Sequence, residues 1–583
     1  MRKTKIVCTL GPATDDDTVL KELMMCGMDV ARINFSHGTH EEQLVRINKF
    51  KKVRDEVGKP IALLLDTKGP EIRINTFKEG KVTLGEGQTF TLVADDVEGD
   101  SEKVSVSCKN LSKDVHVGDR ILIDDGLVGM EVEKICDKNV ICRVTNGGEI
   151  SNRKSINIPN VSIKMPYVSP QDEADIIFGI ENDFDFIAAS FVRTQFDVLD
   201  IRKILEKNKG KDIQIIAKLE NNEGVINSDQ ILRVSDGIMV ARGDMGVEIA
   251  LEDLPVIQKR LIKDCYIAGK KVITATQMLD SMIRNPRPTR AETTDVANAI
   301  YDGTSAIMLS GETAVGKYPV ESVKTMASIA ERAEQDINYQ KRFNEMGVEM
   351  ENNITNAISH ATCTTAHDLG AEAIIAVTNS GHTARMVSKY RPQCPILAPT
   401  VSHRVARQLS LSWGVIPMLS EMKETTDELF EHVVDIAITA GYLKNGDLVV
   451  ITGGAPLGIA GTTNILKVHL VGHVLAQGTA INSLHDSGKA CVAHTVEEAL
   501  RNFNEGDILV VPKTSNEMLP AIKKANGIIC EEEGVAVHAA IVGMALDIPV
   551  ITGVKEATKI LKSGTIISMD SARGLIYAGI TKF

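Results

Sequence analysis

A lysine and two carboxylates stand at the ends of two successive apolar runs. Lys218 and Glu220 follow the run 213–217. Asp244 follows the run 237–241. Parallel barrels carry their chemistry at the carboxyl ends of buried strands. An ammonium beside two carboxylates at adjacent ends favours a divalent metal next to a fixed cation, a set that suits the stabilisation of charge on a moving phosphoryl group.

Short apolar runs that alternate with helical stretches must position these residues. Runs of four to six apolar residues between helices indicate parallel strands. Eight such runs predict an α/β fold, a (β/α)8 TIM barrel, once one long interruption is removed. The runs are 6–9, 30–34, 62–66, 186–190, 213–218, 237–241, 271–275 and 306–310.

The interruption, 70–165, has alternating patterns such as 81–84, 90–93 and 120–123, separated by Gly, Asp and Asn turns and without a convincing helix. It predicts an inserted β-barrel lid domain on hinges at 69–70 and 159–166. Such a lid could close over substrate and exclude water; the alternative is a rigid decoration.

Two further regions follow the barrel. A final amphipathic helix is expected at 321–335, and four strands are then expected at 373–377, 395–398, 447–452 and 467–471. The last region has candidate strands at 507–511, 527–530, 549–552 and 565–568. The predicted domains are the barrel (1–69 and 166–335), the lid (70–165), an α/β effector domain (336–473) and an extra C-terminal swivelling-type domain (474–583).

The second and third strand ends add polar oxygens. Arg32 is a fork donor suited to phosphate. Asn34, Ser36 and Thr67 offer neutral oxygens and Asp66 offers one carboxylate, a mixture that suits a monovalent cation better than Mg²⁺. For Asn34 and Ser36 the alternative is capping of the following helix.

These ends together resemble the pyruvate kinase family. The signature Lys-Leu-Glu-Asn-x-Glu-Gly from Lys218, followed by Gly-Asp-x-Gly from Gly243, is long and specific. The resemblance covers roughly residues 1–473. It implies phosphoryl transfer from phosphoenolpyruvate to ADP, giving pyruvate and ATP. It also implies the cofactors Mg²⁺ (or Mn²⁺) and K⁺ and a cytoplasmic homotetramer.

The resemblance also implies individual roles. Glu220 and Asp244 would bind Mg²⁺, and Lys218 would offset charge on the phosphoryl group and the enolate. Thr276 would bind substrate and help proton delivery through water, and Glu71 favours K⁺ dependence. The remaining implied roles are phosphate contact for Arg32, K⁺ ligation for Asn34, Ser36, Asp66 and Thr67, and nucleotide contact for Pro12, Asn34, His37, Arg73 and Lys154. The free N–H groups that begin at Gly243 could bind a substrate carboxylate.

A hydroxyl-rich turn enters a helix after the strand near 377. Such a turn at a helix N-terminus is a phosphate nest, and in regulated family members the matching loop holds an effector phosphate; an ordinary capped turn is the alternative. Asn379 replaces a Lys, and 452–458 lacks the Trp and Arg of fructose bisphosphate-activated members. We therefore expect a monophosphate, AMP or a sugar monophosphate such as a pentose phosphate. The expected contacts are Thr378, Asn379, Ser380, His382 and Thr383.

The segment 533–543 is similar to the phosphohistidine loop of phosphoenolpyruvate-utilising swivelling domains. His538 matches the phosphorylated histidine, but the hydroxyl residue two positions earlier is Ala536. This loss favours a structural or interface use of His538 over phosphotransfer.

Composition limits the partners. The net charge of -13 argues against nucleic acid as the main partner. No apolar stretch is long enough to span a membrane, no signal peptide is visible, and ten scattered cysteines without CxxC pairs predict reduced thiols. Two rival functions stay open at this point. One is a Mg²⁺-dependent barrel lyase or aldolase acting on pyruvate-like acids, and the other is a metabolite-sensing protein on an inactive barrel.

Overall fold

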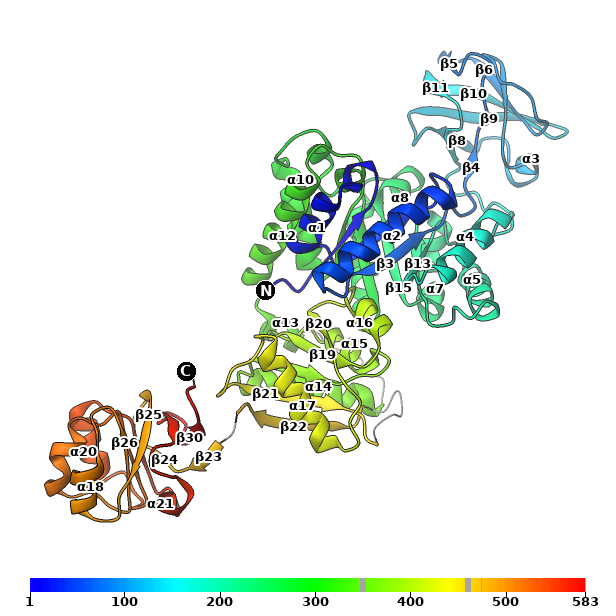
Figure 1. Cartoon of the computed structure of the whole chain (residues 1–583). Helices are drawn as coiled ribbons and strands as arrows, with labels where there is room; N and C mark the ends of the chain where they lie inside the picture. Colours follow the sequence, from blue (N-terminus) through cyan, green and yellow to red (C-terminus); the bar gives the residue numbers. More distant parts are fainter. Residues whose placement is uncertain (346–352, 457–462, 473, 582–583) are drawn as a thin grey trace. The chain divides into compact units, whose positions relative to one another are not determined.

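The barrel is closed and parallel. We describe a computed structural model that covers residues 1–345, 353–456, 463–472 and 474–581. Its eight barrel strands are ordered β1-β17-β16-β15-β14-β13-β3-β2 (Figure 1). They confirm the eight predicted runs, and every strand end lies within one residue of its predicted position. Their bounds are β1 Lys5–Thr9, β2 Val30–Asn34, β3 Ala62–Asp66, β13 Phe186–Ala189, β14 Gln214–Leu219, β15 Gly237–Ala241, β16 Lys271–Ala275 and β17 Ala306–Leu309.

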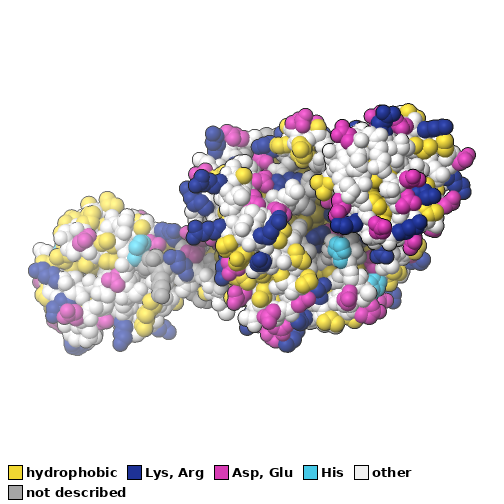
Figure 2. All heavy atoms as spheres, turned by 90° about the horizontal axis from the view of Figure 1, so that it is seen from above, with side chains coloured by type: hydrophobic (Ala, Val, Ile, Leu, Met, Phe, Trp, Pro, Cys, Tyr) yellow, Lys and Arg dark blue, Asp and Glu magenta, His cyan; other side chains and the backbone are white. Residues whose placement is uncertain are grey.

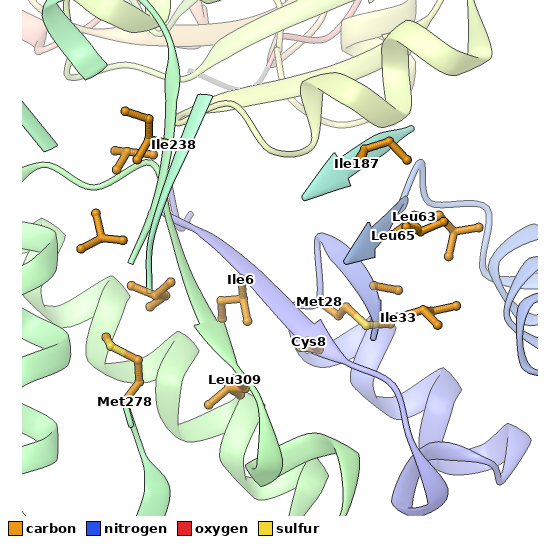
Figure 3. Close-up of a cluster of buried hydrophobic side chains, with 14 of the residues drawn as sticks. Ile6, Cys8, Met28, Ile33, Leu63, Leu65, Ile187, Ile238, Met278 and Leu309 are labelled. Atoms are coloured by element: carbon orange, nitrogen blue, oxygen red, sulfur yellow. The ribbon is translucent and has the colours of Figure 1, made fainter. Parts of the chain in front are cut away.

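Two apolar layers hold the barrel because successive side chains of a strand point to opposite faces. Ile6, Cys8 and Leu309 belong to one buried cluster, shown in Figure 3, which also contains helix residues such as Leu23 and Met326. The alternate strand residues form a second, smaller cluster, as expected for a barrel whose interior is filled by side chains. The predicted last amphipathic helix is α12, Pro319–Asp336.

The inserted region is a β domain. A seven-stranded sheet is ordered β4-β12-β8-β9-β10-β6-β7, and β11 pairs with β5. An isolated bridge between Ile74 and Val106 lies just past the edge strands β4 and β7 and joins the two ends of the sheet. One expectation was wrong: the short helix α3, Leu111–Asp114, lies in this region. The strands are β4 Ile72–Arg73, β5 Lys81–Leu84, β6 Thr89–Val93, β7 Lys103–Ser105, β8 Arg120–Ile123, β9 Val128–Cys136, β10 Asn139–Asn146, β11 Gly148–Ser151 and β12 Ser155–Asn157.

The region after the barrel has a five-stranded sheet, ordered β20-β19-β18-β21-β22. Its strand β20, Val415–Leu419, was not predicted, and it pairs in parallel with β19, Ile396–Thr400. The other three strands, β18 Ala373–Ala376, β21 Leu448–Gly453 and β22 Ile465–Leu470, match predicted runs. Residues 457 and 458 of the segment that lacks Trp and Arg lie outside the described residues.

The last region has an eight-stranded sheet, ordered β23-β30-β29-β25-β26-β27-β28-β24. Four of its strands match predicted runs, namely β26 Ile508–Val511, β27 Gly527–Cys530, β28 Val550–Thr552 and β29 Ile566–Asp570. The other four, β23 Val474–Gln477, β24 Thr479–Ala480, β25 His485–Val492 and β30 Leu575–Ala578, were not predicted.

The chain divides into two compact units. One comprises residues 1–363, 376–421 and 452–465, and the other comprises 364–375, 422–451 and 466–583. None of the described helices is both long and apolar enough to cross a bilayer. Basic and acidic side chains are interspersed over the face seen in Figure 2. The predicted limits of the four domains stay a prediction.

Candidate functional site

Strand parity assembles the site. Val7, Val30, Leu64, Ala188 and Ile216 belong to the smaller apolar cluster and point to one face of their strands. Because the side-chain period of a strand is two, the residues two positions further along reach the same face at the carboxyl ends. Those residues are Thr9, Arg32, Asp66, Ser190 and Lys218.

Lys218 lies at the centre of this group. Its Nζ lies 3.0 Å from Asp66 Oδ1 and 2.8 Å from Ser190 Oγ. A third contact of 2.9 Å joins Lys218 Nζ to Glu220 Oε1. Burial alone lowers the pKa of Lys218, but the charges of Asp66 and Glu220 outweigh burial and raise it. Lys218 therefore stays a fixed cation.

Asp66 joins Lys218 to Arg32. Arg32 Nε donates to Asp66 Oδ2 at 2.6 Å, and Arg32 Nη1 donates to Thr9 Oγ1 at 2.9 Å. Burial raises the pKa of Asp66, yet Arg32 and Lys218 together hold it below its ordinary value. One buried carboxylate thus orients two cations toward the mouth of the barrel.

Glu220 and Asp244 lie close enough to influence each other's pKa. Burial raises the pKa of both carboxyls, and the charge of Asp244 raises that of Glu220 further. Two facing carboxylates repel each other, and a divalent cation between them relieves this repulsion, so the pair fits Mg²⁺. Within the described ranges no group of three or more His, Cys, Asp or Glu side chains could hold a metal. Substrate or water would have to supply the other ligands.

Thr276 lies beside the short helix α8, Arg242–Glu248. Gly243 N donates to Thr276 Oγ1 at 2.7 Å. The Gly243 N–H, which was expected to bind substrate, is therefore already used in a hydrogen bond within the protein. Thr276 and Gln277 both have positive φ, 69° and 54°. Such backbone costs energy in residues other than glycine and clusters at functional sites.

The four residues expected at the K⁺ site come from two adjacent strand ends. Asn34 and Asp66 are register partners on β2 and β3. Asn34 Oδ1 accepts a hydrogen bond from Ser36 N at 3.0 Å, and Thr67 Oγ1 accepts one from Ser190 N at 3.2 Å. The capping alternative for Asn34 and Ser36 is wrong, because Thr39 caps the next helix, α2 His40–Val57.

The residues expected at the nucleotide have varied surroundings. Pro12 and His37 are exposed. Arg73 Nε donates to Glu71 Oε2 at 2.8 Å. Lys154 Nζ lies 2.8 Å from Asp124 Oδ1, an ion pair within the inserted domain.

A cavity of about 220 Å³ lies beside Asp244, with lining residues from both the inserted domain and the barrel. Several hydrogen bonds join these parts at the cavity, and two of them end on glutamates of the barrel. Asn157 Nδ2 donates to Glu248 Oε1 at 3.1 Å, and Ser162 Oγ donates to Glu223 Oε2 at 3.0 Å. The inserted domain therefore contacts helix α8, which carries Asp244, and the short helix α6, Asn222–Ile226, which follows Glu220.

The expected effector loop leads into helix α15, His382–Lys389. No side chain caps this helix, and its N-cap residue, Gly381, has φ of 79°. Thr383 Oγ1 lies 2.9 Å from Thr463 Oγ1. Burial, and then the charge of Arg385, lower the pKa of His382. The turn is thus ordered without the side-chain cap that an ordinary capped turn would have.

His538 begins helix α20, His538–Leu546. Its Nδ1 lies 2.8 Å from Thr514 Oγ1, and its Nε2 lies 3.0 Å from Asn516 Oδ1. Both ring nitrogens are therefore engaged in hydrogen bonds.

Ser190 and Thr9 are the site residues that sequence reasoning missed. Each closes a predicted strand, where a hydroxyl residue is unremarkable. The parity of the neighbouring interior residues, Ala188 and Val7, is the signal that could have identified them.

Comparisons with known proteins cover the whole chain. The family models described as "Pyruvate kinase, barrel domain", "Pyruvate kinase, alpha/beta domain" and "PEP-utilising enzyme, mobile domain" match residues 1–323, 356–469 and 503–574. Relatives named pyruvate kinase from Bacillus licheniformis and Geobacillus stearothermophilus are each 51% identical over 581 residues, 99% of both chains. The structure is similar to a pyruvate kinase from Cryptosporidium parvum, with a TM-score of 0.77 and 39% identity, over 80% of this chain and 96% of that one.

Proposed function

Because the chain belongs to the pyruvate kinase family, it transfers a phosphoryl group from phosphoenolpyruvate to ADP and forms pyruvate and ATP, and we propose that Lys218 and its partners form the centre of this transfer. The observation that carries the proposal is the buried Lys218 ammonium, held between Asp66, Ser190 and Glu220 at the barrel mouth.

Lys218 and Arg32 act on charge. A phosphoryl group in transfer carries negative charge on its equatorial oxygens, and fixed cations in a site shielded from water stabilise that charge without reorganising. Arg32 binds the phosphate and Lys218 offsets charge on the phosphoryl group and the enolate. Thr276 delivers a proton to the enolate through water.

The proposed mechanism also uses two metal cations. Glu220 and Asp244 hold Mg²⁺ (or Mn²⁺), which when bound polarises the phosphoryl oxygens. Asn34, Ser36, Asp66 and Thr67 hold K⁺, and Glu71 makes the enzyme dependent on it. Pro12, Asn34, His37, Arg73 and Lys154 contact the nucleotide, and the inserted domain closes over it.

A coupled assay tests these assignments. Pyruvate formation from phosphoenolpyruvate is measured with ADP, Mg²⁺ and K⁺ each omitted in turn, with ionic strength held constant by a tetramethylammonium salt. We expect activity only with all three. Full activity without K⁺ would remove the four proposed K⁺ ligands from the mechanism, and pyruvate release without ADP would favour the lyase.

We further propose that a phosphate monoester, AMP or a sugar monophosphate, binds the loop of Thr378, Asn379, Ser380, His382 and Thr383 and activates the enzyme. The uncapped N-terminus of α15 supports this assignment. AMP and ribose 5-phosphate are titrated against the phosphoenolpyruvate saturation curve. Either should lower the half-saturating concentration in the wild type but not in Ser380→Ala/Thr383→Val. The absence of any shift would refute the assignment.

The assembly and location are also proposals. We propose a homotetramer, as is usual in the family, and sedimentation velocity of the full chain checks its mass. Ten cysteines without a disulfide support a cytoplasmic location. For His538 the two hydrogen bonds support a structural role, and incubation with ³²P-labelled phosphoenolpyruvate should leave no acid-labile label on it.

A further inference from the structure

A small cavity near the amino ends of β16 and β17 is lined by five basic side chains and by no carboxylate. We call it the cation pocket. Two of its basic residues lie just before and at the start of β16, two belong to helix α15, and one follows Tyr390. They are Lys270, Lys271, Arg385, Lys389 and Arg391.

Four of these cations have no carboxylate partner among the described residues. Across the part of the chain that the structure describes, no carboxylate oxygen lies within 4.0 Å of the charged nitrogens of Lys270, Lys271, Arg385 or Arg391. Lys271 Nζ donates to the neutral Gln214 Oε1 at 2.6 Å, and Lys270 Nζ donates to the carbonyl of Ser235 at 2.7 Å. Buried charge without a partner is costly.

The nearest acidic group is already used. Burial lowers the pKa of Lys270, Lys271 and Arg385, and the charge of Asp236 only partly opposes this lowering. Asp236 Oδ2 accepts hydrogen bonds from Arg202 and from Ile215 N, both at 2.8 Å. Asp236 therefore does not neutralise the pocket.

Two polar atoms in the pocket have no hydrogen-bond partner among the described residues, Arg391 Nε and Ser412 Oγ. Both residues are 3% exposed. Arg391 is otherwise fixed, because its NH2 group donates to Gly303 O at 3.0 Å and its guanidinium lies 4.6 Å from the ring centroid of Trp413. Buried polar groups in native proteins usually have partners, so a missing ligand is indicated.

The removal of these side chains from water is also evident in their pKa values. Burial, and then repulsion from Arg385, lower the pKa of Lys271 to about 7. Burial, and then the charge of Arg342, lower the pKa of Arg391 to about 9. A bound anion would reverse both shifts.

The cavity suits a compact anion. Its volume is about 20 Å³, so it excludes a large ligand. The hydroxyls of Ser305 and Ser412, which also line it, add neutral hydrogen-bonding groups.

We propose that the cation pocket binds the tetrahedral oxyanion of phosphate, away from the active site. The pocket adjoins the effector loop, because Arg385 donates to the carbonyl of Ser380 at 3.1 Å. Filling it would join α15, which carries that loop, to β16, which leads to Thr276. The source is free inorganic phosphate or the phosphate group of an ester, because Lys270 and Lys389 also line a larger neighbouring cavity that could hold an attached organic part.

The test is phosphate-dependent thermal stability of the full chain. Tm is followed from 0 to tens of millimolar inorganic phosphate, with ionic strength held constant by KCl. We expect Tm to rise in the wild type, and the apparent phosphate affinity to fall about tenfold or more in Lys271→Gln and in Arg385→Gln, since each loses a charge-assisted contact. Lys203→Gln, an exposed lysine on α5 (Gln195–Lys207), is the matched control and should behave as wild type.

Two further arms complete the experiment. Ribose 5-phosphate replaces phosphate; a larger, Lys271-dependent rise would identify an ester as the ligand, and an equal or smaller rise would identify free phosphate. Wild-type crystals soaked in selenate, which need no variant to fold, should show anomalous scattering between Lys271, Arg385 and Arg391. An unchanged phosphate response in both variants, or selenate absent from the pocket, would overturn the proposal.

Discussion

Lys218 is held by three oxygens from three different residues, and its charge is the feature on which the proposed chemistry depends most. Replacing it with an apolar residue of similar length leaves Asp66 and Glu220 without their common cation. We expect Lys218→Met to lower kcat by roughly 10²–10³-fold or more, because a preorganised charge next to the transition state is lost. Phosphoenolpyruvate should still bind, as measured by isothermal titration calorimetry. Turnover near the wild-type rate would remove Lys218 from the mechanism.

Ser190 is a positioning residue in this arrangement. Its hydroxyl lies 2.8 Å from Lys218 Nζ, 3.0 Å from Asp66 Oδ1 and 2.6 Å from Thr67 O. Ser190→Ala should lower kcat by about tenfold with a smaller change in KM, since a hydrogen bond to a charged group is worth about 1.5–3 kcal/mol.

A double-mutant cycle separates positioning from general destabilisation. If Ser190 acts through Lys218, Ser190→Ala should cost almost nothing further in the Lys218→Met background. Full additivity of the two effects would contradict the positioning role.

At the scale of elements, the hinge between β3 and the inserted domain bears directly on the site. Gly69 has φ of 70°, and a Cβ there would lie 2.7 Å from the carbonyl oxygen of Ser190. Gly69→Ala should therefore destabilise the fold by about 1–3 kcal/mol and also lower kcat, since Ser190 must shift. Urea unfolding and steady-state kinetics measure the two effects.

Gly80 is the matched control for that substitution. Its φ is 79°, but a Cβ there meets nothing within 4 Å. Gly80→Ala should carry the backbone strain alone, lose about 1–2 kcal/mol and keep its kcat. Equal effects of both substitutions on kcat would show that the contact with Ser190 is unimportant.

At the scale of the whole molecule, none of the ten cysteines forms a disulfide. Cys26, Cys136 and Cys394 are partly exposed, whereas the other seven are buried. Burial raises the pKa of buried thiols such as Cys142, to about 12, which suppresses the reactive thiolate. A thiol reagent should therefore modify at most three cysteines rapidly in the native chain and ten after denaturation. The counts should not change after treatment with a reductant. Fewer than ten in the unfolded chain without reductant would reveal a disulfide.

The sequence by itself determined the barrel. Strands buried on both faces appear in the sequence as apolar runs, so the pattern of these runs was enough to predict all eight. Polar residues at or just after the ends of those runs were predicted to meet, because parallel strands bring their carboxyl ends to one mouth of the barrel. They are Arg32, Asp66, Lys218, Glu220 and Asp244. The same logic failed for β20 and β25. Half-exposed strands such as β25, which reads His-Asp-Ser-Gly-Lys-Ala-Cys-Val, carry no continuous apolar signal, and their pairing depends on distant partners.

Only the tertiary structure decided which residues contact one another. The place of Ser190 between Asp66 and Lys218 depends on strand register across more than a hundred residues of chain, which no local pattern encodes. The same holds for the cation pocket, whose basic residues are ordinary when read in order and become unusual only when folding removes them from water together. A charge has its physical effect through its distance to other charges and through its burial, and both are properties of the packed chain.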